Sequence, residues 1–262
     1  MSNFNYKDYF EPLVPLDLIE YVCGHRDFEE FMRSGMEVFQ MLDLAALKHS
    51  KKHINGFNSI LDFGCGCGRI LRFLNKKGLN VSGCDINQKL IDYCKNSYEY
   101  CDTYNNDLFP PLKYKNNSFD LIYSFSVFSH LSIDVEKSWL EELLRVGAPG
   151  CLYLITIQGD WFIEKTLSPS EISYTEENGF YFKKIHTRSD ESSDLNFPEY
   201  YESSYKTSEY IRKNWSAYFE VLDVVKGDDP SRYLIPGKQF EPIGSIPKLR
   251  PMGQDLVIAR KR

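Results

Sequence analysis

The sequence has no excess of positive charge and no long apolar run. Its 262 residues carry a formal net charge of −6, and the only basic cluster is Arg260–Arg262. A nucleic-acid-binding protein normally presents a basic face or tail, so we do not expect nucleic acid as a partner. The longest strongly apolar stretch, CLYLITI at 151–157, is far shorter than the roughly 20 residues of a membrane-spanning helix. We therefore expect no membrane span.

Metal-binding and secretory cysteine patterns are also absent. The seven cysteines are an odd number, and the opening MSNFNYKDYF lacks the basic-then-apolar order of a secretory leader. Cys65 and Cys67 form a C-x-C rather than a C-x-x-C, and no second close pair offers the other ligands of a zinc site. We expect buried, reduced thiols, no bound metal and a cytoplasmic protein.

What the sequence does contain is enough apolar material for a core, and a change of pattern near residue 58. The hydrophobic fraction is 42%. Before residue 58, apolar side chains recur at helical spacing, and Asp27 with Glu30 three residues later resembles a capping box. We expect residues 1–57 to form a helical N-terminal extension and residues 58–262 to form the main domain.

Strand and helix patterns alternate from residue 58 onward. We expect strands at 59–63, 80–85, 98–104, 119–126, 151–158, 218–225 and 253–260. We expect helices at 69–77, 88–97 and 132–147. This alternation is typical of a parallel sheet with crossover helices. Two stretches interrupt it: an aromatic-rich insertion at about 159–214 and a Pro- and Gly-rich loop at about 226–252.

A glycine-rich turn, ILDFGCGCG at 60–68, follows the first expected strand. Such turns often hold a cofactor, and the glycine spacing separates the classes. A P-loop would need lysine where Ile70 stands. The dinucleotide fingerprint G-x-G-x-x-G would need its third glycine at Arg69 or Leu71. What remains is an acidic residue, one spacer and G-x-G-x-G at a strand–helix junction.

The parts of this turn suit an amino-acid group. Gly64 and Gly66 have no Cβ, so the backbone can approach a ligand closely. The N-terminus of the following helix would present free N–H groups to a carboxylate. Asp62 carries negative charge toward an ammonium group or an ordered water.

Acidic residues further along suit a nucleoside. Asp85 ends the second expected strand about twenty residues after the turn begins, where a ribose-binding acid is expected. Asp107 follows the third strand and can accept a hydrogen bond from an adenine amino group. Leu108 can cover the ring.

In their order and spacing, these segments resemble the class I S-adenosylmethionine-dependent methyltransferases. The resemblance runs over 58–158, through ILDFGCGCGRILRFL, CDIN, NDLFPPL, SFDLIYSFSVFSHL and LRVGAPGCLYLIT, and EVLDVV and QDLVIAR fit the closing strand pair. It implies an α/β, Rossmann-like, seven-stranded, mostly parallel sheet with an antiparallel last strand, and S-adenosylmethionine as cofactor. By position it implies cofactor-binding roles for Asp62, Gly64, Cys65, Gly66, Asp85, Ile86, Asp107, Leu108 and Ser124.

Each of these residues also has a structural interpretation. Gly68 would allow close helix–strand packing, and Asp62 could cap the end of its strand. Asp85 could cap the next helix together with Asn87. Asp107 could form an Asx turn before two prolines.

Methyl transfer from a sulfonium needs positioning and water exclusion more than strong acids or bases. An alcohol acceptor needs a base, whereas a neutral amine can attack first and lose its proton later. His130, on the loop after the fourth strand, is the main candidate for a catalytic base; otherwise it orients that loop or caps the next helix. His186 and Asp160 are weaker candidates.

The acceptor is expected to be a small molecule. Ligands bind at the carboxyl ends of strands in such sheets, so the aromatic insertion should lie over the mouth of the site as a cap. Its rings could stack on a sugar or hold a cation, or form the core of the cap. We expect an O- or N-methyltransferase for a saccharide or another secondary metabolite. Two alternatives stay open: a cofactor-binding regulatory partner without activity, and a nucleotide-linked oxidoreductase, which the glycine spacing disfavours.

Overall fold

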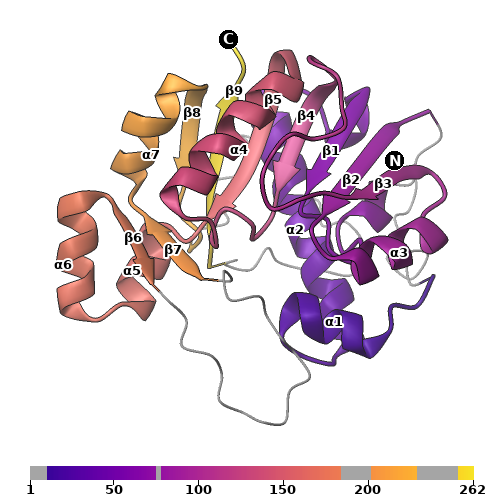
Figure 1. The fold of residues 1–262 in the computed structure, drawn as a ribbon, viewed down its shortest axis with the longest axis horizontal. Helices are drawn as coiled ribbons and strands as arrows, with labels where there is room; N and C mark the ends of the chain where they lie inside the picture. Colours follow the sequence, from indigo (N-terminus) through magenta and orange to yellow (C-terminus); the bar gives the residue numbers. More distant parts are fainter. Residues whose placement is uncertain (1–10, 75–77, 184–201, 229–252) are drawn as a thin grey trace.

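The computed structural model describes residues 11–74, 78–183, 202–228 and 253–262 (Figure 1). Seven strands form the main sheet. In sheet order they are β3 (Cys101–Asn105), β2 (Asn80–Asp85), β1 (Ser59–Phe63), β4 (Phe119–Ser124), β5 (Gly147–Ile157), β9 (Asp255–Arg260) and β8 (Glu220–Val225). Strands β1 to β5 are parallel to one another, and β9 is antiparallel to both neighbours. The expected Rossmann-like sheet with an antiparallel last strand is confirmed.

The order of the strands determines where a ligand can bind. From β1 the chain moves outward to β2 and β3, and then returns to the other side of β1 with β4 and β5. In register, Ile60 of β1 lies between Val81 of β2 and Leu121 of β4. In open α/β sheets, the crevice outside the carboxyl ends of the strands at this reversal is the usual binding site.

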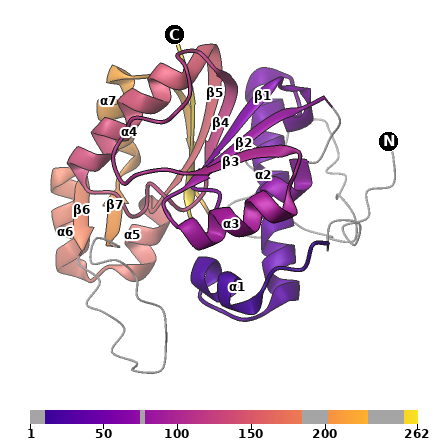
Figure 2. The ribbon, with the colours of Figure 1, turned by 45° about the vertical axis from the view of Figure 1, so that its right-hand side comes forward.

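Helices cover both faces of the sheet (Figures 1 and 2). In chain order they are α1 (Leu16–Cys23), α2 (Phe28–Ser50), α3 (Gln88–Ser97), α4 (Ile133–Val146), α5 (Asp160–Thr166), α6 (Pro169–Asn178) and α7 (Ser208–Asn214). The two adjacent residues Ile60 and Leu61 point to opposite faces. Ile60 packs in one buried cluster with α2 and α3, and Leu61 packs in the other with α4 and α7. This double burial explains why the central strands are apolar on both sides.

The start of α2 agrees with the sequence only in part. The Asp27 side chain accepts a hydrogen bond from the Glu30 N–H at 3.0 Å, as expected of an N-cap. The Glu30 carboxylate does not complete the capping box, because it pairs with Arg33. Among the described helices, a complete capping box is seen instead at α6, between Ser168 and Glu171.

The segment after the glycine turn differs from the expected helix at 69–77. Its described part is a 3₁₀ helix, η3 (Leu71–Leu74), and residues 75–77 lie outside the described ranges. This tighter helix directs the Arg72 side chain into the protein. There the Arg72 guanidinium donates to the Tyr98 hydroxyl at 2.7 Å. Tyr98 also fills the space beside Gly68, where a Cβ would lie 2.2 Å from its ring. Tyr98 is therefore a packing residue, and β3 begins three residues later than expected, at Cys101.

Residues 159–214 contain α5, α6 and α7, and an antiparallel ribbon of β6 (Phe180–Lys183) and β7 (Ser203–Lys206). Figure 1 shows α5, α6 and the ribbon beside the lower ends of the strands, across from α1. The ribbon joins the main sheet where the Lys206 N–H donates to the Gln158 carbonyl at 3.0 Å. Within the described ranges, no helix is both long and apolar enough to cross a membrane.

A fully buried ion pair attaches the ribbon to α4. Lys206 Nζ lies 3.1 Å from Glu136 Oε2, and the two side chains are 0% and 1% exposed. The other carboxylate oxygen, Oε1, accepts from the Tyr210 hydroxyl at 3.2 Å and from the Trp215 indole at 3.0 Å. Buried charges are tolerated when they are paired and hydrogen-bonded in this way.

Candidate functional site

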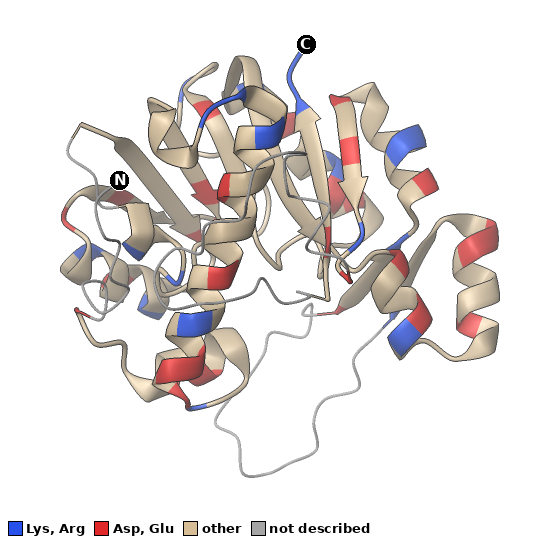
Figure 3. Cartoon of the chain, turned by 180° about the vertical axis from the view of Figure 1, so that it is seen from behind, with Lys and Arg blue, Asp and Glu red and all other residues tan. Residues whose placement is uncertain are grey.

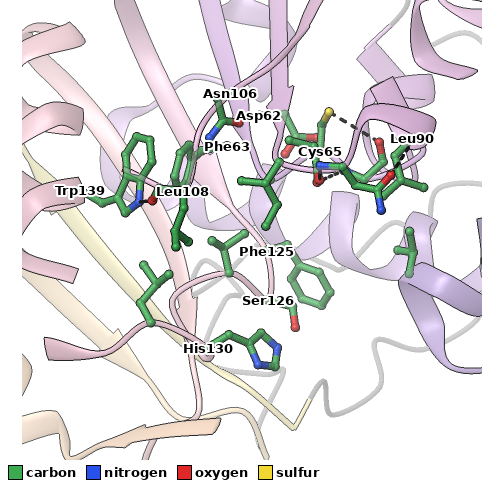
Figure 4. A pocket seen from close by; sticks show the side chains of 18 of the residues that line it. Asp62, Phe63, Cys65, Leu90, Asn106, Leu108, Phe125, Ser126, His130 and Trp139 are labelled. Atoms are coloured by element: carbon green, nitrogen blue, oxygen red, sulfur yellow. Dashed lines mark hydrogen bonds between the residues drawn. The ribbon is translucent and has the colours of Figure 1, made fainter. Parts of the chain in front are cut away.

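A cavity of about 650 Å³ lies at the carboxyl ends of β1, β2 and β4 (Figure 4). Its volume is within the range usual for small-molecule sites. Of the residues predicted from the sequence, it brings together Asp62, Gly64, Cys65, Gly66, Asp85, Ile86, Leu108 and His130. Asp107 and Ser124 are not in its lining.

The glycine turn is clamped between two neighbouring segments. The N–H groups of Gly64 and Cys65 donate to the Cys84 carbonyl at 2.8 and 2.9 Å, which ties the turn to β2. On the other side Gly64, at φ +83°, faces the loop after β4, and a Cβ there would lie 2.1 Å from Val127 Cγ2. Only glycine fits this close approach.

Asp85 links the turn to the end of β2. Its Oδ2 accepts from the Gly66 N–H and its Oδ1 from the Asn87 N–H, both at 2.9 Å. The helix-capping role falls to Asn87, whose side chain accepts from the N–H groups of Lys89 and Leu90. Burial raises the pKa of the Asp85 carboxyl, although the backbone donors oppose this. A carboxylate has about four acceptor positions, so Asp85 can still accept from a diol.

Asp62 is the most deeply buried acid of the cavity, at 2% exposed. The Tyr123 hydroxyl donates to its Oδ2 at 2.8 Å. Burial raises the pKa of the Asp62 carboxyl to about 8; the Tyr123 hydrogen bond works against this, and the nearby Asp85 charge adds to it. At neutral pH the carboxyl is therefore mostly protonated, and a ligand cation beside it would favour its ionised form.

After β3, the structure places Asn106 rather than the predicted Asp107 in the cavity lining. Asp107 is exposed, whereas Asn106 is 8% exposed and lines the cavity. The Asn106 N–H donates to the Asp85 carbonyl at 3.1 Å, which extends the β2–β3 pairing by one residue and turns the Asn106 side chain inward. The amide nitrogen of Asn106 donates to the Asp107 carbonyl at 2.7 Å, so its amide oxygen is the atom that can accept a hydrogen bond from a ligand.

The predicted residue Ser124 likewise does not line the cavity. It is the last residue of β4 and is buried, outside the cavity lining. The chain bends just after it: Ser126 has φ +61° and donates its N–H to Thr156 Oγ1 at 2.8 Å. This bend brings Phe125 and Ser126, rather than Ser124, to the cavity wall.

Several lining residues were missed from the sequence. Arg69, considered there only as a break in a fingerprint, lines the cavity with its guanidinium 4.7 Å from the centre of the Phe125 ring. Trp139 of α4 donates its indole N–H to the Leu108 carbonyl at 3.0 Å and forms a wall with Leu108. The other residues come from distant segments: Tyr21 and Val22 of α1, and Phe182 and Glu202 at the ribbon. No local sequence signal marks these last four.

His130 lies on the loop between β4 and α4 and lines the cavity (Figure 4). Its Nδ1 is 2.9 Å from the Glu202 carbonyl oxygen. A carbonyl only accepts, so this contact assigns the proton to Nδ1 and the lone pair to Nε2. Burial lowers the pKa of His130 to about 4; the Glu202 hydrogen bond opposes this and the Lys206 charge adds to it. His130 is thus neutral at neutral pH, and it also ties its loop to the ribbon.

Asp160, one of the weaker catalytic candidates, is not in the cavity lining. Asp160 begins α5, where its Oδ1 accepts from the Ser208 N–H at 3.1 Å and its own N–H donates to Asp255 at 2.8 Å. These contacts are structural. His186 lies outside the described residues.

All seven cysteines are free thiols, and no group of three or more His, Cys, Asp or Glu side chains in the described ranges is arranged to hold a metal ion. Burial raises the pKa of Cys67, Cys84 and Cys151, so these thiols are inert packing groups.

The sheet order, the glycine turn after β1 and the acid at the end of β2 define a class I S-adenosylmethionine-dependent methyltransferase fold. Residues 60–150 match the family described as a methyltransferase domain. This match identifies residues 60–150 as a methyltransferase domain, and the fold shared with the S-adenosylmethionine-dependent methyltransferases described next implies S-adenosylmethionine as the cofactor.

Solved structures share this fold at low sequence identity. A protein from Pyrococcus horikoshii is 15% identical with a TM-score of 0.53, over 86% of this chain and 90% of that one. A SAM-dependent methyltransferase from Methanosarcina mazei is 20% identical with a TM-score of 0.52, over 78% and 92%. An S-adenosylmethionine-dependent methyltransferase from Mesorhizobium loti is 17% identical with a TM-score of 0.50, over 79% and 92%.

Proposed function

We propose that this protein transfers the methyl group of S-adenosylmethionine to an oxygen or nitrogen of a small molecule, such as a secondary metabolite. The observation that carries this proposal is the extent of the cavity. One end is formed by Asp62, Asp85 and Asn106 at the strand ends, and the other by His130 and Glu202. At about 650 Å³ it has room for a second small molecule beside the cofactor.

The residues of the first end fit the cofactor group by group. The space beside Gly64 and Gly66, which a Cβ would narrow, suits the amino-acid part. The Asp62 carboxyl, whose pKa is raised by burial, suits an ammonium group, because a nearby cation favours the ionised carboxylate.

The nucleoside part has its own partners. The remaining acceptor positions of Asp85 suit the two ribose hydroxyls, and the amide oxygen of Asn106 suits the adenine amino group. Leu108 and Trp139 form an apolar wall for the ring. Arg69 is the cationic side chain in the cavity lining and suits the carboxylate.

Bound S-adenosylmethionine supplies a methyl carbon already activated by a sulfonium. The work left to the chain is to position the acceptor and to exclude water. Phe125, Val127 and Leu131 give the loop after β4 an apolar inner surface. His130 lines this part of the cavity, where its imidazole can contact the acceptor. Because the pKa of His130 is lowered to about 4, its role is orientation more than strong base catalysis.

The surface and the thiols support the expected setting. Figure 3 shows acidic and basic residues interspersed over the described chain, with no continuous basic stripe in that view. This supports a small-molecule acceptor over nucleic acid. The free cysteines support a reducing, cytoplasmic environment.

The first test is calorimetry with S-adenosylhomocysteine and NAD. We expect binding of the former and none of the latter; tight binding of NAD alone would contradict the proposal. The second test is a screen of small acceptors with a labelled methyl donor, read as labelled product. Intact S-adenosylhomocysteine binding without transfer to any acceptor would favour the alternative of a silent regulatory partner.

A further inference from the structure

One face of the β6–β7 ribbon is turned toward the loop that carries His130. In the antiparallel register Phe182 lies opposite Ser204, and Phe180 lies opposite Lys206. Residues that face each other across such a pair point to the same side of the sheet. Phe180, Phe182, Ser204 and Lys206 therefore share one face. The other face carries Tyr205, which packs against α5.

Glu202 belongs to the same face. Side chains two apart along an extended chain point to the same side, and Glu202 is two residues before Ser204. The main chain supports this: the Glu202 carbonyl accepts from His130 Nδ1 at 2.9 Å, and the Ser204 N–H donates to the Ser129 carbonyl at 2.8 Å. Two backbone groups two residues apart thus bond to one neighbouring segment, as in a strand.

This face is held firmly against the loop. Ser204 Oγ and Lys206 Nζ both donate to the Phe128 carbonyl, at 3.0 and 2.6 Å. The charge of Lys206 is matched by Glu136. The position of Glu202 beside the cavity is therefore set by the contacts of its neighbours.

One oxygen of the Glu202 carboxylate lacks a hydrogen-bond donor in this position. The residue is 8% exposed and lines the cavity, and its Oε2 is buried without a hydrogen-bond donor. No cationic side chain in the described ranges is within ion-pair distance of it. A buried carboxylate oxygen without a donor is costly, so this position suits a donor or cation that arrives with a ligand.

Aromatic rings also line the cavity. Phe182 lines it on the ribbon face shared with Glu202, and Tyr21 and Phe125 line it from α1 and the loop after β4. A carboxylate together with aromatic rings is the chemistry that recognises an organic ammonium, through an ion pair and cation–π contacts.

We propose that the acceptor end of the cavity binds an organic ammonium group, held by the Glu202 carboxylate and the Phe182 ring. The inference rests on the proposed function and narrows its acceptor to small molecules that carry a basic amine.

The test uses the protein loaded with S-adenosylhomocysteine. Two probe pairs are titrated by calorimetry: 2-phenylethylamine against 2-phenylethanol, and cyclohexylamine against cyclohexanol. Each pair has the same shape with and without the charge. We expect each amine to bind at least about tenfold more tightly than its alcohol, as for a partly buried ion pair. Glu202→Gln should remove most of this preference and leave S-adenosylhomocysteine binding unchanged.

Glu209→Gln is the matched control, because Glu209 is an exposed acid in the next helix of the same segment. It should retain the full preference for the amines. Equal binding of amine and alcohol, absence of binding for both pairs, or an unchanged preference in Glu202→Gln would overturn the inference. If the unsubstituted protein does not bind S-adenosylhomocysteine but still prefers the amines, the proposed function alone is overturned.

Discussion

The two ends of the cavity are built in different ways. At the cofactor end, the side chains sit at the ends of adjacent strands and the main chain fixes them: Asp85 accepts from the N–H groups of Gly66 and Asn87. At the acceptor end, formed by His130 and Glu202, the lining comes from the loop after β4 and the ribbon, which are far apart in sequence. The first end is a product of sheet topology, and the second is assembled by tertiary contacts. Changes at the two ends should therefore have different consequences.

The largest effect on stability is expected where the glycine turn of the cofactor end contacts the loop after β4. Gly64→Ala adds a Cβ 2.1 Å from Val127 at φ +83°. Strain and overpacking should together lower the free energy of unfolding by about 2–5 kcal/mol, measured by urea denaturation. Gly150→Ala is the control, because Gly150 has φ +78° with no atom within 4 Å of the added Cβ. Val127→Ala should restore part of the loss in Gly64→Ala; equal losses in the two glycine variants would refute the contact.

Asp85→Ala comes next and concerns the cofactor end alone. It should weaken S-adenosylhomocysteine binding by about 1–3 kcal/mol, through the loss of hydrogen bonds to a charged acceptor. Calorimetry measures the change. The amine preference at the other end, measured with the probe pairs, should remain. Unchanged affinity would remove Asp85 from the site.

The pH dependence of cofactor binding should follow Asp62. Its pKa of about 8 means that the carboxyl is mostly protonated at pH 6–7. An ammonium group needs the ionised form, so binding releases a proton and the affinity should rise with pH below 8. The affinity can rise by at most tenfold per pH unit, which corresponds to about 1.4 kcal/mol of binding free energy.

This dependence is measured with S-adenosylhomocysteine between pH 6 and 7.5, below the titration of its own amino group. The control ligand is 5′-methylthioadenosine, which has no amino-acid part and should bind with a flat profile. Asp62→Asn should flatten the profile of S-adenosylhomocysteine as well. A steep profile in that variant would assign the proton to another group.

The smallest effect tests the corrected position after β3. Asn106→Ala should weaken S-adenosylhomocysteine binding by about 1 kcal/mol, the value of one hydrogen bond between neutral groups. Asp107→Ala should have no effect, because Asp107 is exposed outside the cavity. The reverse result would restore the assignment made from the sequence.

The sequence predicted the sheet and much of the cofactor end because both depend on local patterns. The apolar run before Asp62, the turn glycines and Asp85 lie at strand ends, and parallel strands end together. Two lining positions differ from the prediction, and both differences have local causes. The backbone bond of Asn106 places that residue in the lining instead of Asp107, and the bend at Ser126 places Phe125 and Ser126 there instead of Ser124.

Elsewhere tertiary contacts overrode the local pattern. Over its described part the helix expected at 69–77 is a 3₁₀ helix, Leu71–Leu74, whose inward Arg72 side chain is held by its contact with Tyr98. Glu202 and Phe182 could not be predicted, because their place depends on the buried bonds of Ser204 and Lys206 to the Phe128 carbonyl. Pairings between segments this far apart leave no periodic signal in one sequence.

The buried Lys206–Glu136 pair has a consequence for any exchange of parts between proteins of this fold. A chimera that replaces residues 159–214 alone would leave Glu136 inside the protein without its counter-charge, at a cost of about 3–5 kcal/mol. The insertion and α4 therefore form one transplantable unit, and a graft meant to carry over acceptor preference must include both.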